Sequence, residues 1–382
     1  MSKVTWVLVL GIIISCNLAK ENNFTSDSKA EQEEKTSFYV GTYTNVTSIE
    51  EGSSQGIYKY VIDKDGKLSK IGLAAVSNNP SFLAKTADNR YLVATNETSG
   101  SSDNGTVVSY EIDGDTLNKK SISDSGGAHP CHVSINKEGD ILVSNYTGGN
   151  VGLLKISKNG TLSDVLDVQQ HEGNGTHQRQ DAPHAHSSWF RPDGIGIISV
   201  DLGTNELISS EIEGHTFVKE KTSKLQMKAE AGPRHIAFHP NGKYLYVLNE
   251  LDNTVGLVSI SESGALRIGK AISMLPKGYT DFNKGADIHV SNDGRFVYAS
   301  NRGHNSIAIF EVDMKDGSLM LLATESTKGD SPRNFTLALD DNYVLVANQK
   351  SNNIVSFSRD KKTGLLSYVD VIDAPAPVCL LF

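Results

Sequence analysis

A short strand pattern that ends in Asn or Asp recurs along the chain at intervals of 47 to 56 residues. The copies end at Asn96, Asn145, Asp201, Asn249, Asn301 and Asn348. Phe38–Tyr43 starts the series, which makes seven units. A period near fifty residues with several strands per unit is typical of a β-propeller. Because the terminal Asn or Asp is nearly invariant, we interpret it as structural, holding the loop that follows.

One unit divides cleanly into four strands. Pro233–His239 and Tyr244–Asn249 flank an Asn-Gly pair, which is the strongest short hairpin signal. Thr254–Ile260 alternates apolar and polar residues, and Leu266–Ile272 follows a Ser-Gly turn as an outer strand. The sequence therefore predicts an all-β fold, a seven-bladed β-propeller with four antiparallel strands per blade.

The two ends of the repeat predict how the ring closes. The first unit begins at its second strand, at Phe38, so its innermost strand is missing. Residues 374–382 match the first strands at 80–84 and 130–134. We therefore expect the C-terminal strand to complete blade one, which leaves no open blade edge. The 382 residues would suggest two or three domains by length alone, but closure predicts a single domain over 37–382.

The N-terminus has the features of an export signal. A lysine precedes an apolar run over Val4–Ile14, and this run is too short to span a bilayer as a helix. We expect a signal peptide over 1–15. The residues before Cys16 resemble a bacterial lipobox, which predicts lipidation of Cys16 and an acidic tether over 16–36. An ordinary secretory signal is the alternative.

These N-terminal features predict an exported bacterial protein, either periplasmic or an outer-membrane-anchored lipoprotein, that touches a membrane only through its lipid. The formal net charge of −9 argues against a general nucleic-acid binder. Cys131 and Cys379 fall in non-adjacent units, so we expect free, buried thiols rather than a disulfide. We also expect a monomer.

Polar residues gather at one rim of the predicted ring. The start of each first strand and the end of each second strand meet there, because the two strands form an antiparallel hairpin. Histidines at this rim are His132, His184, His186, His235 and His289. Each one alone is as well explained by hydrogen-bonded packing. As a cluster with nearby arginines, they favour acid/base chemistry and anion binding.

A metal site is a competing interpretation of the histidines. The histidines lie on different blades, and only His184 and His186 are closely spaced, so we expect no metal and no cofactor. Two insertions, at 169–183 and 273–286, enter at the same rim. Long loops on a rigid scaffold often carry function, so these segments are expected to wall a pocket.

Several rim motifs together resemble the seven-bladed propeller lactonase family, to which bacterial 6-phosphogluconolactonases and the related fungal carboxymuconate-lactonising enzymes belong. The matching stretches are Arg179-Gln180, Pro183–Ser187, Gly232–His235, His239–Lys243, Asn249–Leu251, Ala286–Val290, Ser300–Asn305 and Pro332-Arg333. The resemblance covers about residues 37–382. It implies a lactone hydrolase, a carboxylic ester hydrolase acting on 6-phosphoglucono-1,5-lactone or a related sugar lactone.

The resemblance also implies roles for individual residues. His186 and Glu250 match the acid/base pair of the fungal enzymes, and either would deprotonate the attacking water. The residues expected to bind the substrate anion or the oxyanion are Arg234, Arg302, His132, His235, His289, Arg333 and Arg179. Such groups stabilise the charge that develops during ester hydrolysis.

Other functions stay open at this point. An exported enzyme would meet little phosphorylated sugar lactone, so a plain aldonolactone is the second candidate substrate. A lactonising cycloisomerase would differ only in its substrate. A propeller that binds a glycan or another ligand without catalysis is a third possibility.

Overall fold

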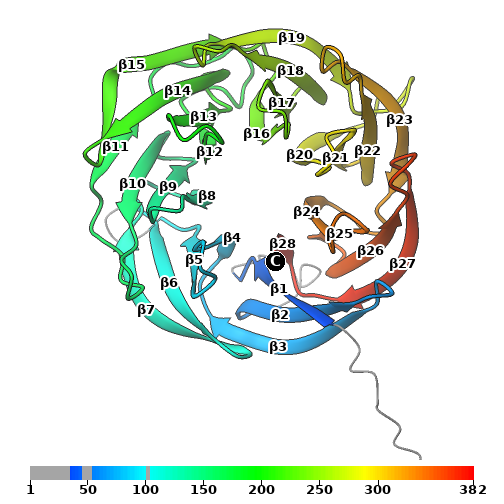
Figure 1. Ribbon diagram of the computed structural model, residues 1–382, viewed down its shortest axis with the longest axis horizontal. Helices are drawn as coiled ribbons and strands as arrows, with labels where there is room; N and C mark the ends of the chain where they lie inside the picture. The colour runs from blue at the N-terminus through cyan, green and yellow to red at the C-terminus, as the bar shows by residue number, and fades with distance from the viewer. Residues whose placement is uncertain (1–34, 45–53, 100–103) are drawn as a thin grey trace, which may run out of the picture. The chain divides into compact units, whose positions relative to one another are not determined.

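The computed structural model describes residues 35–44, 54–99 and 104–382. The predicted signal peptide over 1–15, Cys16 and nearly all of the tether over 16–36 lie outside the described residues. Within the described part of the chain, the 28 strands form seven separate four-stranded sheets. Figure 1 shows these sheets as blades of a ring around a central opening. The predicted seven-bladed, all-β architecture is confirmed.

Each blade runs from an inner strand to an outer strand. Blade one contains β28 (Pro377–Leu381), β1 (Lys35–Thr42), β2 (Gly56–Asp63) and β3 (Leu68–Val76). Blade two contains β4 (Pro80–Lys85), β5 (Tyr91–Asn96), β6 (Thr106–Asp113) and β7 (Thr116–Asp124). Blade three contains β8 (Pro130–Ile135), β9 (Asp140–Asn145), β10 (Asn150–Lys155) and β11 (Asp167–Gln170). Blade four contains β12 (Ala185–Phe190), β13 (Ile197–Asp201), β14 (Glu206–Glu213) and β15 (Thr216–Gln226).

The remaining three blades repeat this order. Blade five contains β16 (Pro233–Phe238), β17 (Tyr244–Asn249), β18 (Thr254–Ile260) and β19 (Leu266–Ser273). Blade six contains β20 (Lys284–Val290), β21 (Phe296–Arg302), β22 (Ser306–Val312) and β23 (Leu319–Ser326). Blade seven contains β24 (Pro332–Ala338), β25 (Tyr343–Asn348), β26 (Asn353–Arg359) and β27 (Leu366–Asp373).

The ring closes through the C-terminal strand, as the sequence predicts. Strand β28 lies inside β1 and pairs with it antiparallel, with Leu380 opposite Val40 and Leu381 opposite Tyr39. The ring of Phe382 packs on Phe38 at 5.1 Å between centroids. Both ends of the described domain are therefore held in one sheet, and no blade edge faces an unfilled neighbour.

The hydrophobic core lies between neighbouring blades. One cluster joins Tyr246 and Leu248 of β17 to Val297 of β21 and Phe310 of β22, and each of these side chains is fully buried. Burial of a large apolar side chain contributes about 1.5–3 kcal/mol, so these repeated clusters stabilise the ring. The rigid ring is what fixes the positions of the inner strands and the rim.

The recurring Asn has the structural role that its repetition indicates. The side-chain amide of Asn145 donates to Asn150 Oδ1 at 2.8 Å, and that of Asn348 donates to Asn353 Oδ1 at 2.9 Å. In both cases the amide holds the loop that leads to the third strand. Both described cysteines, Cys131 and Cys379, are free and buried, as expected. Among the described residues, no helix is long and apolar enough to cross a membrane.

Candidate active site

Three arginines converge on one buried carboxylate at the rim. Glu250 directly follows β17, and its side chain is only 3% exposed. Arg179 Nη1 donates to Glu250 Oε1. Arg302 Nη2 lies 3.0 Å and Arg234 Nε 3.2 Å from Glu250 Oε2. We call these four residues the Arg–Glu250 cluster.

The members of the cluster come from distant parts of the sequence. Arg234 is the second residue of β16, and Arg302 is the last residue of β21 in the next blade. Arg179 lies in the insertion at 169–183, which precedes blade four. The insertion therefore reaches into the predicted site, and the structure brings together four of the nine predicted acid/base and binding residues.

The charges of this cluster decide how Glu250 can act. Burial works to raise the pKa of the Glu250 carboxyl, but Arg302, Arg234 and Arg179 outweigh burial and hold that pKa well below its ordinary value. Glu250 is therefore ionised at neutral pH and has little affinity for a proton. Three cations around one anion also leave an excess of positive charge at the rim, which attracts anions.

Arg333 forms a second positive centre at the rim. Its Nη2 donates to the hydroxyl of Tyr43 at 2.8 Å, and that hydroxyl donates to Glu97 Oε2 at 2.8 Å. The guanidinium also lies 5.2 Å from the centre of the Tyr43 ring. Tyr43 and Glu97 thus orient Arg333, and neither was predicted as a site residue. Tyr43 follows the first strand of the chain and had no aligned counterpart in the other units.

His186 has the surroundings of a neutral imidazole. It lies on β12 and is 5% exposed, with its Nδ1 3.8 Å from Cys131 Sγ and its ring edge-on to Tyr146 at 5.5 Å. Burial, and then the charge of Arg234, lower its pKa well below the ordinary value. The imidazole is therefore unprotonated at neutral pH and can accept a proton.

Tyr146 links His186 to the Arg–Glu250 cluster. Its hydroxyl accepts a hydrogen bond from Arg179 Nη2 at 2.9 Å, and its ring stacks on His184 at 4.5 Å. Tyr146 occupies the variable position after the recurring Asn, as Glu250 does in its own blade. That variation was the only sequence signal that could have marked Tyr146 as functional.

His235 contacts an arginine rather than the space above the rim. Its Nε2 accepts from Arg234 Nη1 at 3.3 Å, and its Nδ1 donates to Asp287 Oδ1 at 2.8 Å. Burial and then Arg234 lower the pKa of His235 to about 4, against the opposing pull of Asp287. His235 therefore positions Arg234, and Asp287 positions His235. Asp287 was not predicted as a site residue.

Two predicted binding residues lie away from the rim, and their expected positions are corrected. His132 is completely buried, and its ring packs between Phe82 at 4.3 Å and Trp189 at 4.5 Å. His289 is the sixth residue of β20 and lines a cavity at the opposite end of the inner strands. In β20 it is Gly285 that pairs with the recurring Asn301, as Pro233 pairs with Asn249, so His289 lies four residues beyond the rim pair and Arg234 only one.

A cavity of about 400 Å³ opens at the rim beside Arg302. It is lined by Phe282, Lys284, Arg302, Gly303, Asp330, Ser331, Gln349 and Lys350. Phe282 and Lys284 lie in the segment 273–286. This insertion therefore forms part of the wall of a pocket, as expected from the sequence. Phe282 is 71% exposed, and Lys284 Nζ lies 5.4 Å from the centre of its ring.

The sequence offered one clue to Lys284. All other inner strands begin with Pro or Ala, and only β20 begins with a charged residue. As for metals, the described residues contain no group of three or more His, Cys, Asp or Glu side chains placed to hold an ion.

Comparison with known proteins agrees with this geometry. Residues 37–382 match the family model described as "Lactonase, 7-bladed beta-propeller". The chain belongs to the seven-bladed β-propeller lactonase family. This membership assigns it to the lactone hydrolases.

Individual relatives in this family cover nearly the whole chain. A 6-phosphogluconolactonase of Bacillus subtilis is 36% identical over 90% of this chain and 97% of its own length. A 6-phosphogluconolactonase of Formosa agariphila is 33% identical over 86% of this chain and 94% of its own length. The solved structure of a periplasmic gluconolactonase from Pseudomonas aeruginosa is 29% identical, with a TM-score of 0.83, and covers 91% of this chain and 98% of its own.

Proposed function

We propose that this protein hydrolyses the ester bond of a phosphorylated sugar lactone of the 6-phosphoglucono-1,5-lactone type and releases the aldonic acid. The observation that carries the proposal is the excess of buried positive charge at the rim. Arg179, Arg234 and Arg302 surround Glu250, and Arg333 adds a second centre. A plain sugar lactone carries no charge for these cations to attract before it reacts, whereas a phosphorylated one does.

His186 is the base in this proposal. Its neutral imidazole takes a proton from water, and the water oxygen attacks the lactone carbonyl carbon. The carbonyl oxygen becomes an oxyanion, which a guanidinium of the Arg–Glu250 cluster stabilises. When the bond from the carbonyl carbon to the ring oxygen breaks, the protonated His186 returns its proton to that ring oxygen. The sum is one lactone and one water converted to one hydroxy acid.

Glu250 has a different task from the one that its resemblance to an acid/base residue implies. Because three arginines hold its pKa low, Glu250 is a poor proton acceptor. Its carboxylate instead fixes the guanidiniums before substrate arrives. Charges that are already oriented stabilise a transition state without reorganisation at the moment of reaction. We therefore assign Glu250 as a positioning residue and His186 as the catalytic one.

The cavity of about 400 Å³ beside Arg302 is the proposed seat of the phosphate. Lys284 and Lys350 line it together with Arg302, and they outnumber its one acidic residue, Asp330. Burial, and then the charge of Arg179, lower the pKa of the Lys284 ammonium. An anion bound beside Lys284 would offset both effects and stabilise its charge. A phosphate group in this cavity could accept hydrogen bonds from several cationic side chains at once.

The test follows acid release from 6-phosphogluconolactone and from plain gluconolactone, each corrected for spontaneous hydrolysis. We expect a higher kcat/KM for the phosphorylated lactone. Lys284→Met should raise KM for that substrate and leave KM for the plain lactone unchanged. Lys361→Met, an exposed lysine on another loop, is the matched control. Equal kcat/KM for the two lactones would refute the phosphate assignment.

A plain sugar lactone is the second candidate substrate. The likeness to a periplasmic gluconolactonase and the predicted export signal both favour it. The same assay separates the two, because the plain lactone would then be the better substrate. A lactonising cycloisomerase would convert neither, and turnover of neither would also leave a binding propeller as the remaining interpretation.

We also infer export and lipid attachment at Cys16, supported by the signal and lipobox-like sequence. The prediction is that the full chain fractionates with membranes and that Cys16→Ser moves it to the soluble exported fraction. Wild-type protein found only in the soluble cytoplasmic fraction would refute both. A monomer, also proposed, is checked by light scattering of the purified protein.

A further inference from the structure

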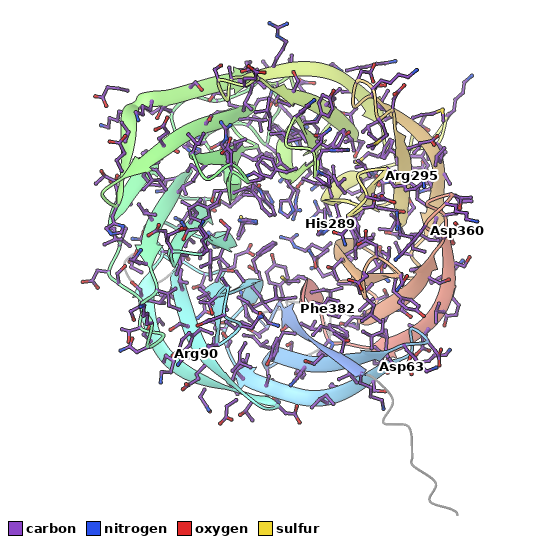
Figure 2. The ribbon with its side chains drawn as sticks, viewed as in Figure 1. Asp63, Arg90, His289, Arg295, Asp360 and Phe382 are labelled. Atoms are coloured by element: carbon purple, nitrogen blue, oxygen red, sulfur yellow. The ribbon has the colours of Figure 1, made fainter. Side chains whose placement is uncertain are left out.

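A second cavity of about 530 Å³ lies at the opposite mouth of the central channel. The ends of the inner strands of six blades line it, whereas the rim described above is formed by the starts of these strands. Figure 2 labels two of its lining residues, His289 and Phe382, beside the central opening. We call it the far cavity.

A layer of rings separates the far cavity from the Arg–Glu250 cluster. The buried His132 packs against Phe82 on one side and Trp189 on the other. His235 contacts the same layer, with its ring centre 5.7 Å from that of His132. A molecule in the far cavity would therefore not occupy the proposed catalytic site.

The walls of the far cavity are mainly apolar. Its lining includes five aromatic side chains and several aliphatic ones: Phe82, Trp189, Phe190, Phe335, Phe382, Val133, Ile135, Leu380 and Leu381. Its volume falls in the range of about 300–1,000 Å³ that is common for small-molecule sites. An apolar body of one ring or a short branched chain would be buried there at a gain of roughly 25 cal/mol per Å².

The polar groups of the far cavity favour an anion. Asp287 is the only acidic side chain in the lining, and its oxygens already accept from His235, His289 and Asn334 and from two backbone amides. His289 donates from Nε2 to Asp287 Oδ2, and its side chain is 35% exposed, so its ring adds a polar edge to the cavity wall. Lys85 also lines the cavity, and its Nζ lies 5.2 Å from the ring centre of Tyr39. Within the described residues, no carboxylate pairs with Lys85.

We propose that the far cavity binds a small monocarboxylate with an aromatic or branched-alkyl body. The body would lie against Trp189 and Phe335, and the carboxylate would face Lys85. The charge of Lys85 and the filled hydrogen bonds of Asp287 carry the choice of an anion over a cation. None of the residues that line the far cavity is assigned a contact with the lactone, so the two proposals can succeed or fail separately.

Trp189 provides a direct reporter, because it lines the cavity and the chain has only two tryptophans. The probes are phenylacetate and its neutral analogue phenylacetamide, titrated into the full-length protein by fluorescence and calorimetry. We expect phenylacetate to quench Trp189 and to bind at least tenfold more tightly than the amide. Trp189→Phe should remove the optical signal.

Two variants locate the binding. Lys85→Met should weaken phenylacetate binding about tenfold and leave the amide unchanged, whereas Lys119→Met on the outer strand β7 should change neither. Thr336→Trp should fill the cavity and abolish binding, with lactone turnover and melting temperature as checks of folding. Ala84→Leu is a smaller filling that should weaken binding if Thr336→Trp fails to fold.

Three results would overturn the proposal. One is the absence of binding by both probes at millimolar concentration. Another is equal affinity for acid and amide, because the anion would then not be recognised. The third is unchanged binding in a folded variant with a filled cavity, since the ligand would then lie elsewhere.

Discussion

Replacing Glu250 with Gln tests how the rim is held together. The substitution keeps the shape of the side chain but removes the one carboxylate shared by Arg179, Arg234 and Arg302. The Arg234 and Arg302 side chains are only 4% and 13% exposed, so they cannot turn freely to water, whereas Arg179 is 29% exposed. Removing one partner of a buried ion pair costs about 3–5 kcal/mol, because the other charge stays buried.

The expected loss of stability is large enough to measure. For a domain of this size, a change of 1 kcal/mol shifts the melting temperature by about 1.4 °C, so Glu250→Gln should lower Tm by about 4–7 °C. Calorimetry on the purified protein measures it. Glu206→Gln is the matched control, since Glu206 pairs at 3.0 Å with a single lysine that is 44% exposed. That control should cost less than about 1 kcal/mol.

Added inorganic phosphate should stabilise Glu250→Gln more than it stabilises the wild type, because the anion would replace the lost carboxylate among the three arginines. A variant that melts within 2 °C of the wild type and responds equally to phosphate would refute the reasoning. The arginines would then not depend on Glu250 for their charge balance.

Three further predictions concern protonation and closure. The acid limb of the pH profile of kcat/KM should lie below pH 6.5. The pKa of His186 is lowered, so its imidazole stays neutral until the pH falls through that pKa. An acid limb above pH 7 would contradict the assignment of His186 as the base. The free energy of unfolding should fall as the pH drops from 6.5 to 4, because His235 is protonated near pH 6.5 in the unfolded state but only near its pKa of about 4 in the folded state. Urea unfolding should measure a loss of about 3 kcal/mol, and the loss should be smaller in His235→Asn. Deleting residues 380–382 removes two paired residues of β28 and the Phe382 ring that packs on Phe38. The deletion should lower the free energy of unfolding by about 5 kcal/mol or more, measured by thermal unfolding. A melting temperature equal to that of the wild type would show that ring closure needs only the rest of β28.

The fold could be predicted from the sequence because the strand pattern of one blade recurs in seven units. Six copies repeat an apolar strand that ends in Asn or Asp, and three of them carry an Asn-Gly or Asp-Gly turn before it, so an error in one copy is corrected by the others. Closure followed from two fragments, Phe38 at the start and Leu380 near the end, which only fit as parts of one sheet. Local signals of this kind need no knowledge of side-chain packing.

The site could be predicted only in part, because its contacts join residues from separate blades. The repeat placed Arg234, Glu250 and Arg302 at one rim, and the family motif in the insertion added Arg179, but nothing in the sequence showed that the three arginines would all pair with Glu250. The same alignment misplaced His289, since Gly285 is the residue that pairs with the recurring Asn301 and His289 lies four residues farther along the strand. Protonation states depend on burial and neighbouring charge, which is why the sequence left the base open between His186 and Glu250 and the proposal of His186 rests on the structure.

The rate of acid release from 6-phosphogluconolactone by wild type and His186→Ala tests the central claim most directly. Wild-type protein should hydrolyse the lactone well above the rate in buffer, and His186→Ala should lose about 10²–10⁴-fold in kcat because the general base is gone. Its melting temperature should stay within a few degrees of the wild type. Turnover by a folded His186→Ala at the wild-type rate would contradict the account.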